Sequence, residues 1–202
     1  MLSPDTFWAG RFGDDYSSRN SGAGLEASNI ALFRRILETL RYNIDSVIEF
    51  GCNIGLNLKA LKEIDPCLEL AAVEINERAA QQARDLGLGP VMVDDITRNL
   101  SIGLRFDLAF TKGVLIHIAP ADLPRVYLNL YDASTRYVLL CEYYNPTPVM
   151  VPYRGKRNRL WKRDFAGEMI DMFGMKLVDY GFAYRRDNES PQDDLTWFLL
   201  EK

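Results

Sequence analysis

The chain has 202 residues, of which 48% are hydrophobic and 26% are charged, and its net charge is −4. This length and composition fit a single globular domain over residues 1–202. The acidic balance argues against nucleic acid as a partner, because phosphate binding usually leaves a strongly basic surface. The sequence shows neither the ~20-residue apolar run of a membrane span nor the start of a secretory signal, so we expect a cytoplasmic protein.

The cysteines and the histidine argue against two kinds of site. Cys52, Cys67 and Cys141 form an odd set without CxxC spacing, and the chain has one histidine. This usage disfavours a disulfide framework and a zinc site, so we expect no bound metal. We expect all three cysteines to pack as small apolar residues.

The first 22 residues are rich in serine, glycine, aspartate and aromatic residues without a clear period, which predicts an irregular arm. Apolar residues then recur at helical spacing from Leu25 to Leu40 and predict an amphipathic helix. The arm is too aromatic for a disordered tail. We expect it to fold over a bound ligand as a lid, and packing of its aromatic residues on the core is the alternative.

Short apolar strands alternate with helices along the middle of the chain. We predict strands at 46–50, 68–73, 90–93, 106–110 and 137–142, and helices at about 55–64, 76–86 and 121–131. Because parallel strands need crossover connections, this alternation predicts a mainly parallel sheet with helices on both faces.

The end of the chain has a different pattern. After a helix predicted at about 162–173, strands at 175–184 and 195–201 are joined by the polar stretch 185–194. That stretch is too short and polar for a crossover helix, so these two strands should pair antiparallel. The predicted fold class is therefore α/β: a Rossmann-like, seven-stranded, mainly parallel sheet with a C-terminal antiparallel hairpin.

A buried strand runs directly into a glycine turn and a helix in the segment Glu49-Phe50-Gly51-Cys52-Asn53-Ile54-Gly55. Glycine at positions 51 and 55 lets the backbone turn sharply and approach a ligand, and the helix that follows offers unpaired N–H groups. Such a turn also serves simply to connect a strand to a helix. The glycine turn alone does not distinguish these two interpretations, so other residues are needed.

Acidic residues follow the next two predicted strands. Glu74 and Ile75 come 23 and 24 residues after Gly51, near the spacing at which a carboxylate in these folds accepts hydrogen bonds from ribose hydroxyls. Asp95 and Ile96 place another acceptor and a backbone N–H after the third strand. Ligands of open α/β sheets bind at this edge, so the sequence favours a nucleoside site there.

The segment from Glu49 to Gly55 resembles the first motif of the class I S-adenosylmethionine (SAM)-dependent methyltransferases, acidic-x-Gly-x-Gly-x-Gly, and the resemblance covers nearly all of the chain. It implies SAM as the cofactor, with Glu74 at the ribose hydroxyls and Asp95 at the adenine edge. Independently of the resemblance, Tyr16 and Arg19 of the arm are candidate contacts to the methionine carboxylate or to the substrate. The predicted cofactor residues are therefore Tyr16, Arg19, Glu49, Gly51, Asn53, Gly55, Glu74, Ile75, Asp95, Ile96, Lys112 and Gly113.

Two positions of the glycine turn bear on this resemblance. Asn53 replaces the middle glycine, and asparagine is the residue other than glycine that best tolerates a positive φ. An NAD enzyme is the natural competitor, but its Gly-x-Gly-x-x-Gly motif needs a third glycine where this chain has Leu56. That difference disfavours hydride transfer.

Residues 106–118 resemble the strand-four motif of small-molecule methyltransferases and include His117, the single histidine. Two interpretations of His117 stay open. It accepts a proton from a substrate hydroxyl or amine as a general base, or it orders the loop or caps the helix that follows. Tyr144, after the fifth strand, is the second catalytic candidate.

Residues 144–160 are predicted to form the substrate loop. Six of the ten residues from Arg154 to Arg163 are basic, which suits a phosphate or carboxylate group that arginine grips with two hydrogen bonds. A solvated charged surface is the alternative. The substrate-binding candidates are Asn145, Tyr153, Arg154 and Lys156.

The segments Phe7-Trp8-Ala9-Gly10-Arg11-Phe12-Gly13, Glu142-Tyr143-Tyr144-Asn145-Pro146 and Tyr153-Arg154-Gly155 look like those of the methylases associated with pseudaminic acid biosynthesis. This resemblance implies methyl transfer (EC 2.1.1.-) to oxygen or nitrogen of an anionic small molecule, a sugar or nucleotide sugar of the nonulosonic acid type. The alternatives are a non-catalytic SAM-binding regulatory module and a nucleic-acid methyltransferase. The oligomeric state stays open.

Overall fold

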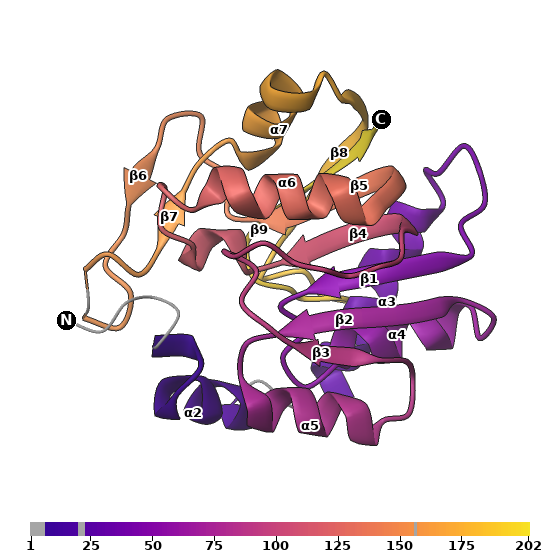
Figure 1. The fold of residues 1–202 in the computed structure, drawn as a ribbon, viewed down its shortest axis with the longest axis horizontal. Helices are drawn as coiled ribbons and strands as arrows, with labels where there is room; N and C mark the ends of the chain where they lie inside the picture. The colour runs from indigo at the N-terminus through magenta and orange to yellow at the C-terminus, as the bar shows by residue number, and fades with distance from the viewer. Residues whose placement is uncertain (1–6, 20–22, 156) are drawn as a thin grey trace.

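The computed structural model describes residues 7–19, 23–155 and 157–202 (Figure 1). Its main sheet contains seven strands within these residues: β1 (Ser46–Phe50), β2 (Glu69–Glu74), β3 (Val91–Val93), β4 (Phe106–Lys112), β5 (Ser134–Glu142), β8 (Lys176–Ala183) and β9 (Leu195–Glu201). They lie in the order β3-β2-β1-β4-β5-β9-β8. The first five pair parallel, and β9 runs antiparallel to both β5 and β8. The predicted fold class is confirmed.

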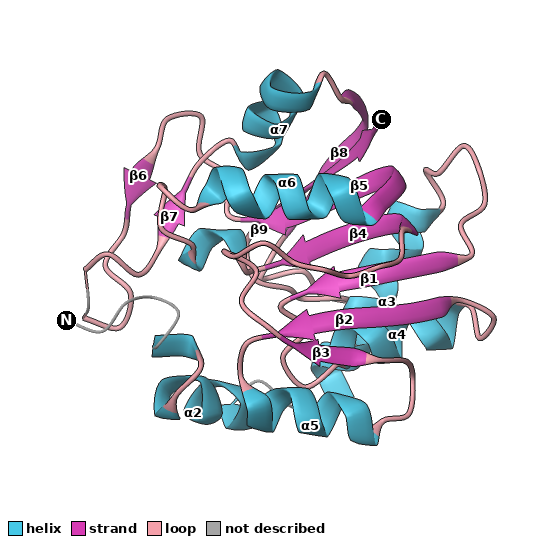
Figure 2. Ribbon diagram, viewed as in Figure 1, coloured by secondary structure: helices cyan, strands magenta, loops and turns pink. Residues whose placement is uncertain are grey.

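Helices cover both faces of this sheet (Figure 2). One face is covered by α3 (Ala23–Leu37), α4 (Leu56–Ile64) and α5 (Glu77–Asp85), and the other by α6 (Leu123–Ala133) and α7 (Phe165–Phe173). Each group of helices buries its apolar residues against the strands in a core of its own. Because both faces are covered, the strands read in the sequence as continuous apolar runs rather than as alternating ones.

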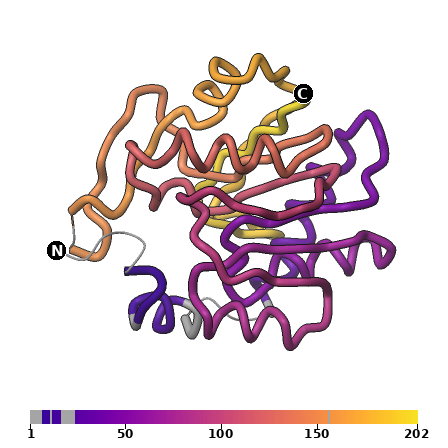
Figure 3. The backbone as a smooth tube through the Cα atoms, in the orientation of Figure 1, coloured from indigo at the N-terminus to yellow at the C-terminus, as the bar shows by residue number. Residues whose placement is uncertain are grey.

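The N-terminal segment differs from the prediction of an irregular arm, because Arg11–Arg19 form helix α2. Figure 3 shows α2 beside α5, and Asp14 of α2 pairs with Arg78 of α5 at 3.1 Å. The polar, glycine-containing sequence of this segment led to the prediction of an irregular arm, and contacts to α5 hold the helix in place. Residues 1–6 and 20–22 lie outside the described residues.

The region between β5 and α7 also contains structure that the sequence pattern did not indicate. The predicted loop 144–160 contains β6 (Val149–Met150), which pairs with β7 (Trp161–Lys162). The predicted helix at 162–173 begins only at Phe165, because the Asp164 side chain caps it by accepting a hydrogen bond from the Gly167 N–H at 2.8 Å.

One expectation about the cysteines is wrong. Cys52 and Cys141 are buried, whereas Cys67 is exposed in the turn that precedes β2. The Cys67 N–H donates to the side chain of Asp65 in this turn, and the apolar residue that enters the core beside it is Leu68. Among the described residues, no helix is long and apolar enough to cross a membrane.

Candidate functional site

A cavity of about 450 Å³ opens at the carboxyl ends of the parallel strands. Residues 51–54, 73–76, 94–97 and 112–114 line it, and they follow or end β1, β2, β3 and β4. This is the edge at which open α/β sheets bind their ligands, and the volume is that of a small-molecule site. The structure therefore brings the glycine turn, Glu74 and Asp95 together in one cavity.

The two glycines of the turn have different surroundings. Gly51 lines the cavity with φ 81°, and a Cβ there would lie 2.6 Å from Cγ2 of Val114. Gly55 does not line the cavity: it starts α4 with φ 82°, and a Cβ there would lie 2.9 Å from Cδ1 of Leu86. The missing Cβ of Gly51 thus lets the turn pack closely against Val114 in the loop after β4, and the missing Cβ of Gly55 lets it pack closely against the end of α5. Asn53 takes the positive φ, 50°, that its residue type allows.

The Glu74 carboxylate is fixed by backbone groups on either side of the cavity. Its Oε2 accepts a hydrogen bond from the Asn53 N–H at 2.8 Å, and its Oε1 accepts one from the Asn76 N–H at 2.9 Å. Burial raises the pKa of Glu74, while these hydrogen bonds act in the opposite direction. Each oxygen keeps acceptor capacity for a further donor, because an ionised carboxylate offers about four lone-pair positions.

The loop after β3 presents two aspartates to the cavity. The Asp95 Oδ1 accepts hydrogen bonds from the N–H of Thr97 at 2.9 Å and from its hydroxyl at 2.7 Å, so this carboxylate shapes its own loop. Asp94 accepts from the Asp95 N–H at 2.7 Å and also lines the cavity, although the sequence analysis did not single it out. Ile96 lines the cavity between Asp95 and Thr97.

Glu49, the acidic residue of the glycine motif, lies behind the cavity wall and is fully buried. Its Oε1 accepts a hydrogen bond from the side-chain amide of Asn57 at 2.6 Å, and Asn57 does line the cavity. Oε2 has no hydrogen-bond partner among the described residues. Burial raises the pKa of Glu49 to about 8, against the lowering effects of Asn57 and the nearby Lys112 ammonium. Glu49 is therefore protonated at neutral pH and positions Asn57.

Lys112 and Gly113 end β4 and line the cavity. Burial lowers the pKa of Lys112, and the nearby Asp193 carboxylate acts against that shift. Gly113 has φ 68°, and a Cβ there would meet nothing within 4 Å. The wall at this point therefore leaves room for a ligand.

His117 lines the cavity at the end of the short 3-10 helix η1 (Leu115–His117). Its Nδ1 lies 2.6 Å from the carbonyl oxygen of Arg159. Because a carbonyl only accepts, Nδ1 carries the proton in the neutral ring and Nε2 is left as an acceptor. Burial lowers the pKa of His117 to about 4, so the ring is neutral at pH 7. The Trp8 and Tyr153 rings lie 4.5 and 5.0 Å from it, centroid to centroid.

The turn that carries His117 is held by the carboxylate of Glu142, at the end of β5. This carboxylate accepts hydrogen bonds from the N–H groups of Val114, Leu115 and Ile116 at 3.0, 3.1 and 3.3 Å. Burial raises the pKa of Glu142 to about 7, against these hydrogen bonds. This role of Glu142 could not be predicted from the sequence, because the three N–H groups that it binds belong to a distant segment and have no sequence signal.

Two predicted substrate residues, Tyr153 and Arg154, do not line the cavity but lie close to His117, which does. Tyr153 contacts His117, and the Arg154 guanidinium carbon lies 5.8 Å from the Tyr153 ring centre. Tyr16 lines the cavity, and burial raises its pKa to about 12. The side chain of Arg19 and the whole of Lys156 lie outside the described residues.

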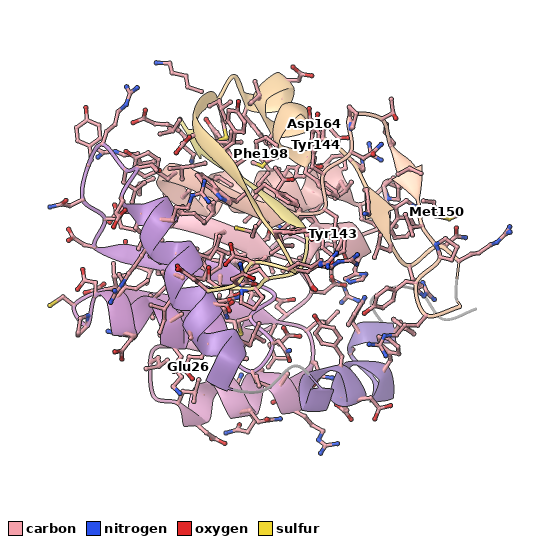
Figure 4. All side chains as sticks on the ribbon, turned by 180° about the vertical axis from the view of Figure 1, so that it is seen from behind. Glu26, Tyr143, Tyr144, Met150, Asp164 and Phe198 are labelled. Carbon is pink, nitrogen blue, oxygen red and sulfur yellow. The ribbon has the colours of Figure 1, made fainter. Side chains whose placement is uncertain are left out.

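Tyr144 and Asn145 lie apart from the cavity. The Tyr144 ring packs on Phe198 of β9 with 5.6 Å between ring centres. Figure 4 labels both residues. The Asn145 amide donates to the carbonyl of Thr147 in its own loop. The structure does not bring the two catalytic candidates, Tyr144 and His117, to one place.

The described basic residues of 154–163 do not gather around one point, in contrast to the expected arginine grip on an anionic group. Arg159 is buried, with its guanidinium carbon 4.9 Å from the centre of the Phe7 ring. Arg163 pairs with Glu168 at 2.7 Å. Among the described residues of this segment, the exposed basic side chains are those of Arg154 and Arg157.

The loop between β8 and β9 was treated in the sequence analysis only as a connection, yet it lines the cavity with Arg185, Pro191, Gln192 and Asp193. The buried Gln192 amide donates to the buried Asn29 of α3 at 2.8 Å. The Tyr143 hydroxyl donates to Asp193 at 3.1 Å. These two contacts join residues that are 163 and 50 positions apart in the sequence, so spacing could not reveal them.

Comparison with family models gives no match for this chain. Among curated proteins, a UPF0146 protein of Methanocaldococcus jannaschii, MJ0688, is 26% identical over 107 residues, which is 53% of this chain and 73% of that protein.

Solved methyltransferase structures share the fold. Magnesium protoporphyrin IX methyltransferase from Synechocystis PCC 6803, with bound S-adenosylhomocysteine (SAH), superposes with a TM-score of 0.72 at 12% identity over 99% of this chain and 100% of that chain. A SAM-dependent methyltransferase from Clostridium acetobutylicum has a TM-score of 0.64 at 14% identity over 95% and 97%. The glycopeptide N-methyltransferase MtfA, also complexed with SAH, has a TM-score of 0.66 at 10% identity over 96% and 98%. At such identities the likeness establishes the fold.

Proposed function

We propose that this chain is a SAM-dependent methyltransferase (EC 2.1.1.-) that acts on a small molecule. One observation carries the proposal: the Glu74 carboxylate, fixed by two backbone N–H groups, faces a cavity that four parallel strand ends line. A carboxylate so placed suits the two hydroxyls of a ribose. Structures with the same fold are methyltransferases, and two of them hold SAH.

The residues of the cavity fit this cofactor. Glu74 and Ile75 would hold the ribose, and Asp95 with Ile96 would meet the adenine edge. The turn at 51–53 and the open space beside Gly113 would take the methionine part, together with Lys112 and Tyr16. Glu49 would act through Asn57, and Gly55 through the packing of α4, because neither residue lines the cavity.

SAM, when bound, supplies a methyl group whose bond to the sulfonium sulfur breaks as an oxygen or nitrogen of the acceptor bonds to the methyl carbon, leaving SAH. The acceptor loses a proton in this exchange. Neutral His117 leaves Nε2 as a proton acceptor beside the cavity, with its ring orientation set by the Arg159 carbonyl. The aromatic rings of Trp8 and Tyr153 around it would exclude water.

For the acceptor we propose an anionic sugar or nucleotide sugar of the nonulosonic acid type. Two guanidinium groups support an anionic acceptor: Arg185 lines the cavity, and the exposed Arg154 stands at Tyr153, beside His117. Within the proposed site, Tyr144 and Asn145 would act from outside the cavity, by supporting the segment that leads to Tyr153.

Isothermal titration calorimetry with SAM and SAH is the first test. We expect binding of both, and we expect Glu74→Ala to weaken it by ~1.5 to 3 kcal/mol, the contribution of a hydrogen bond to a charged group. Glu69→Ala is the matched control, because Glu69 is exposed at the opposite end of the same strand. No binding of either ligand at ~100 μM, far above the dissociation constant of a working site, would overturn the proposal.

Turnover is the second test. The protein, SAM and a panel of sugars and nucleotide sugars should produce SAH, faster with carboxylated or phosphorylated acceptors than with neutral ones. SAM binding without turnover on any acceptor would favour the non-catalytic module. Steeply salt-dependent binding to RNA or DNA would favour nucleic-acid methylation instead.

A further inference from the structure

We infer that Asn76 couples the N-terminal segment, residues 7–16, to the proposed nucleoside site, so that docking of this segment and binding of the ligand favour each other. The identity of the ligand rests on the proposed function. Asn76 acts here as a positioning residue: it lines the cavity, but its side chain joins two parts of the protein.

Asn76 is 3% exposed, and its polar groups reach three parts of the molecule. Its backbone N–H donates to Glu74 Oε1 at 2.9 Å. Its Oδ1 accepts from the Ala79 N–H at 2.9 Å and so caps the first turn of α5. Its Nδ2 donates to the Trp8 carbonyl at 3.3 Å and to Asp14 Oδ1 at 3.0 Å. Asn76 therefore contacts the Glu74 carboxylate, the first turn of α5 and the N-terminal segment.

The N-terminal segment packs closely at this point. A Cβ on Gly13 would lie 2.8 Å from Asn76 Nδ2 and would overlap the Trp8 carbonyl oxygen. The same segment places the side chains of Trp8 and Tyr16 in the cavity wall, with their rings 5.3 Å apart. Trp8 and Tyr16 therefore form part of the cavity wall when the N-terminal segment is docked at Asn76.

Coupling follows from these contacts. A ligand that touches both Glu74 and the wall formed by Trp8 and Tyr16 has more contacts when the segment is docked than when it is released. A ligand that binds one state more tightly shifts the population toward it, and the effect is reciprocal. Ligand binding should therefore protect the segment, and release of the segment should weaken binding.

Hydrogen exchange of the α2 amides, measured by mass spectrometry with and without SAH, tests this in the wild-type protein. We expect SAH to slow exchange in residues 11–19, because binding reduces the fraction of molecules with the segment released. SAH that binds without changing this exchange would overturn the inference and leave the proposed function standing. Failure of SAH to bind at all would overturn the proposed function, and the inference with it.

Asn76→Ser separates coupling from capping. Serine is as good an N-cap as asparagine, so the start of α5 should be kept, while the Nδ2 donor is lost. We expect faster exchange of residues 11–19 without ligand and about tenfold weaker SAH binding, as for loss of two hydrogen bonds of ordinary strength.

Two further variants complete the experiment. Gln82→Ser, an exposed amide on the same helix, should change neither affinity nor exchange. Asn76→Asp keeps the cap but places a carboxylate against Asp14, so it should release the segment more fully than Asn76→Ser. Wild-type affinity and exchange in both Asn76 variants would overturn the inference.

Discussion

The two sides of the cavity are built in different ways. On the side proposed to bind the nucleoside, called here the nucleoside side, the turn after β1, Glu74 and the loop after β3 each continue directly from a parallel strand, and backbone N–H groups hold the Glu74 carboxylate. On the side proposed to bind the methyl acceptor, called here the acceptor side, His117 is positioned by Arg159, by Glu142 and by the ring of Trp8, which come from three distant segments.

This difference shows which interactions position the residues of each side. Strand pairing and local backbone hydrogen bonds position most of the nucleoside side, because neighbouring parallel strands bring their ends to one edge. The acceptor side depends on buried ionisable groups and on long-range side-chain contacts. Single substitutions on the two sides should therefore differ in their effects on the pH dependence of stability, on the free energy of unfolding and on ligand affinity.

Glu49→Gln should have the largest effect and tests the buried acid beneath the nucleoside side. The folded protein keeps the Glu49 proton up to about pH 8, whereas the unfolded chain loses it near 4.5, so wild-type stability falls as pH rises between these values. The variant should lack this fall, which is on the order of 4 kcal/mol in total. Urea unfolding at pH 5 and pH 8.5 measures it, and a difference between the two proteins that does not vary with pH would contradict the expectation.

Glu142→Ala tests the acceptor side. Loss of the carboxylate leaves three N–H groups of the η1 turn without their acceptor, which should lower the unfolding free energy by about 3 kcal/mol. Glu142→Gln keeps one acceptor oxygen and should lose less. Thermal and urea unfolding measure both variants. If the two sides are as distinct as we argue, SAH affinity should fall less in Glu142→Ala than in Glu74→Ala.

The protonation of His117 provides the opposite pH dependence. Its pKa is lowered from 6.5 to about 4 in the folded protein, so the unfolded chain binds the extra proton between these values and stability falls as pH falls. At pH 5 this amounts to about 2 kcal/mol relative to pH 7. His117→Gln should remove that component, measured as the difference between the two proteins in urea unfolding at pH 5 and pH 7. Parallel stability profiles would show that His117 is not buried as a neutral ring.

Asn53→Gly should have the smallest effect. The φ of 50° already suits asparagine, so glycine relieves little strain, and we expect stability to stay within about 0.5 kcal/mol and SAH affinity within about threefold. Asn53→Val is the contrasting variant, since a β-branched residue at positive φ is strained and should destabilise the turn. Equal behaviour of the two variants would mean that backbone conformation at this position does not matter to the site.

The same contrast explains what the sequence could predict. The order of β1, α4, β2 and α5 follows from apolar runs, helical periods and the glycine turn, all of which are local. Glu74 and Asp95 were predicted at the cavity because each continues a strand, and the structure places both there. The C-terminal hairpin was predicted from the length and polarity of its loop, and the pairing of β8 with β9 confirms it.

The remaining features come from contacts between distant segments. Helix α2 is held by a contact to α5, which lies more than 60 positions further along the chain. Gln192 is held in the cavity wall by a hydrogen bond to Asn29, 163 positions away. The cluster of basic residues near Arg159 looked like an anion site, but the fold buries one arginine on Phe7 and pairs another with Glu168. Charge counted along a sequence does not tell which side chains share a surface.

The two N–H groups that fix Glu74 also affect the thermodynamics of association. A free glutamate loses rotamer entropy when a ligand orders it, at roughly 0.5 to 1.5 kcal/mol for one side chain. Here the Asn53 and Asn76 backbone restricts that side chain as soon as the chain folds. If the proposed function holds, recognition of a diol at this carboxylate begins with a rigid pair of acceptor oxygens, and the ordering that remains falls on the segment that carries Trp8.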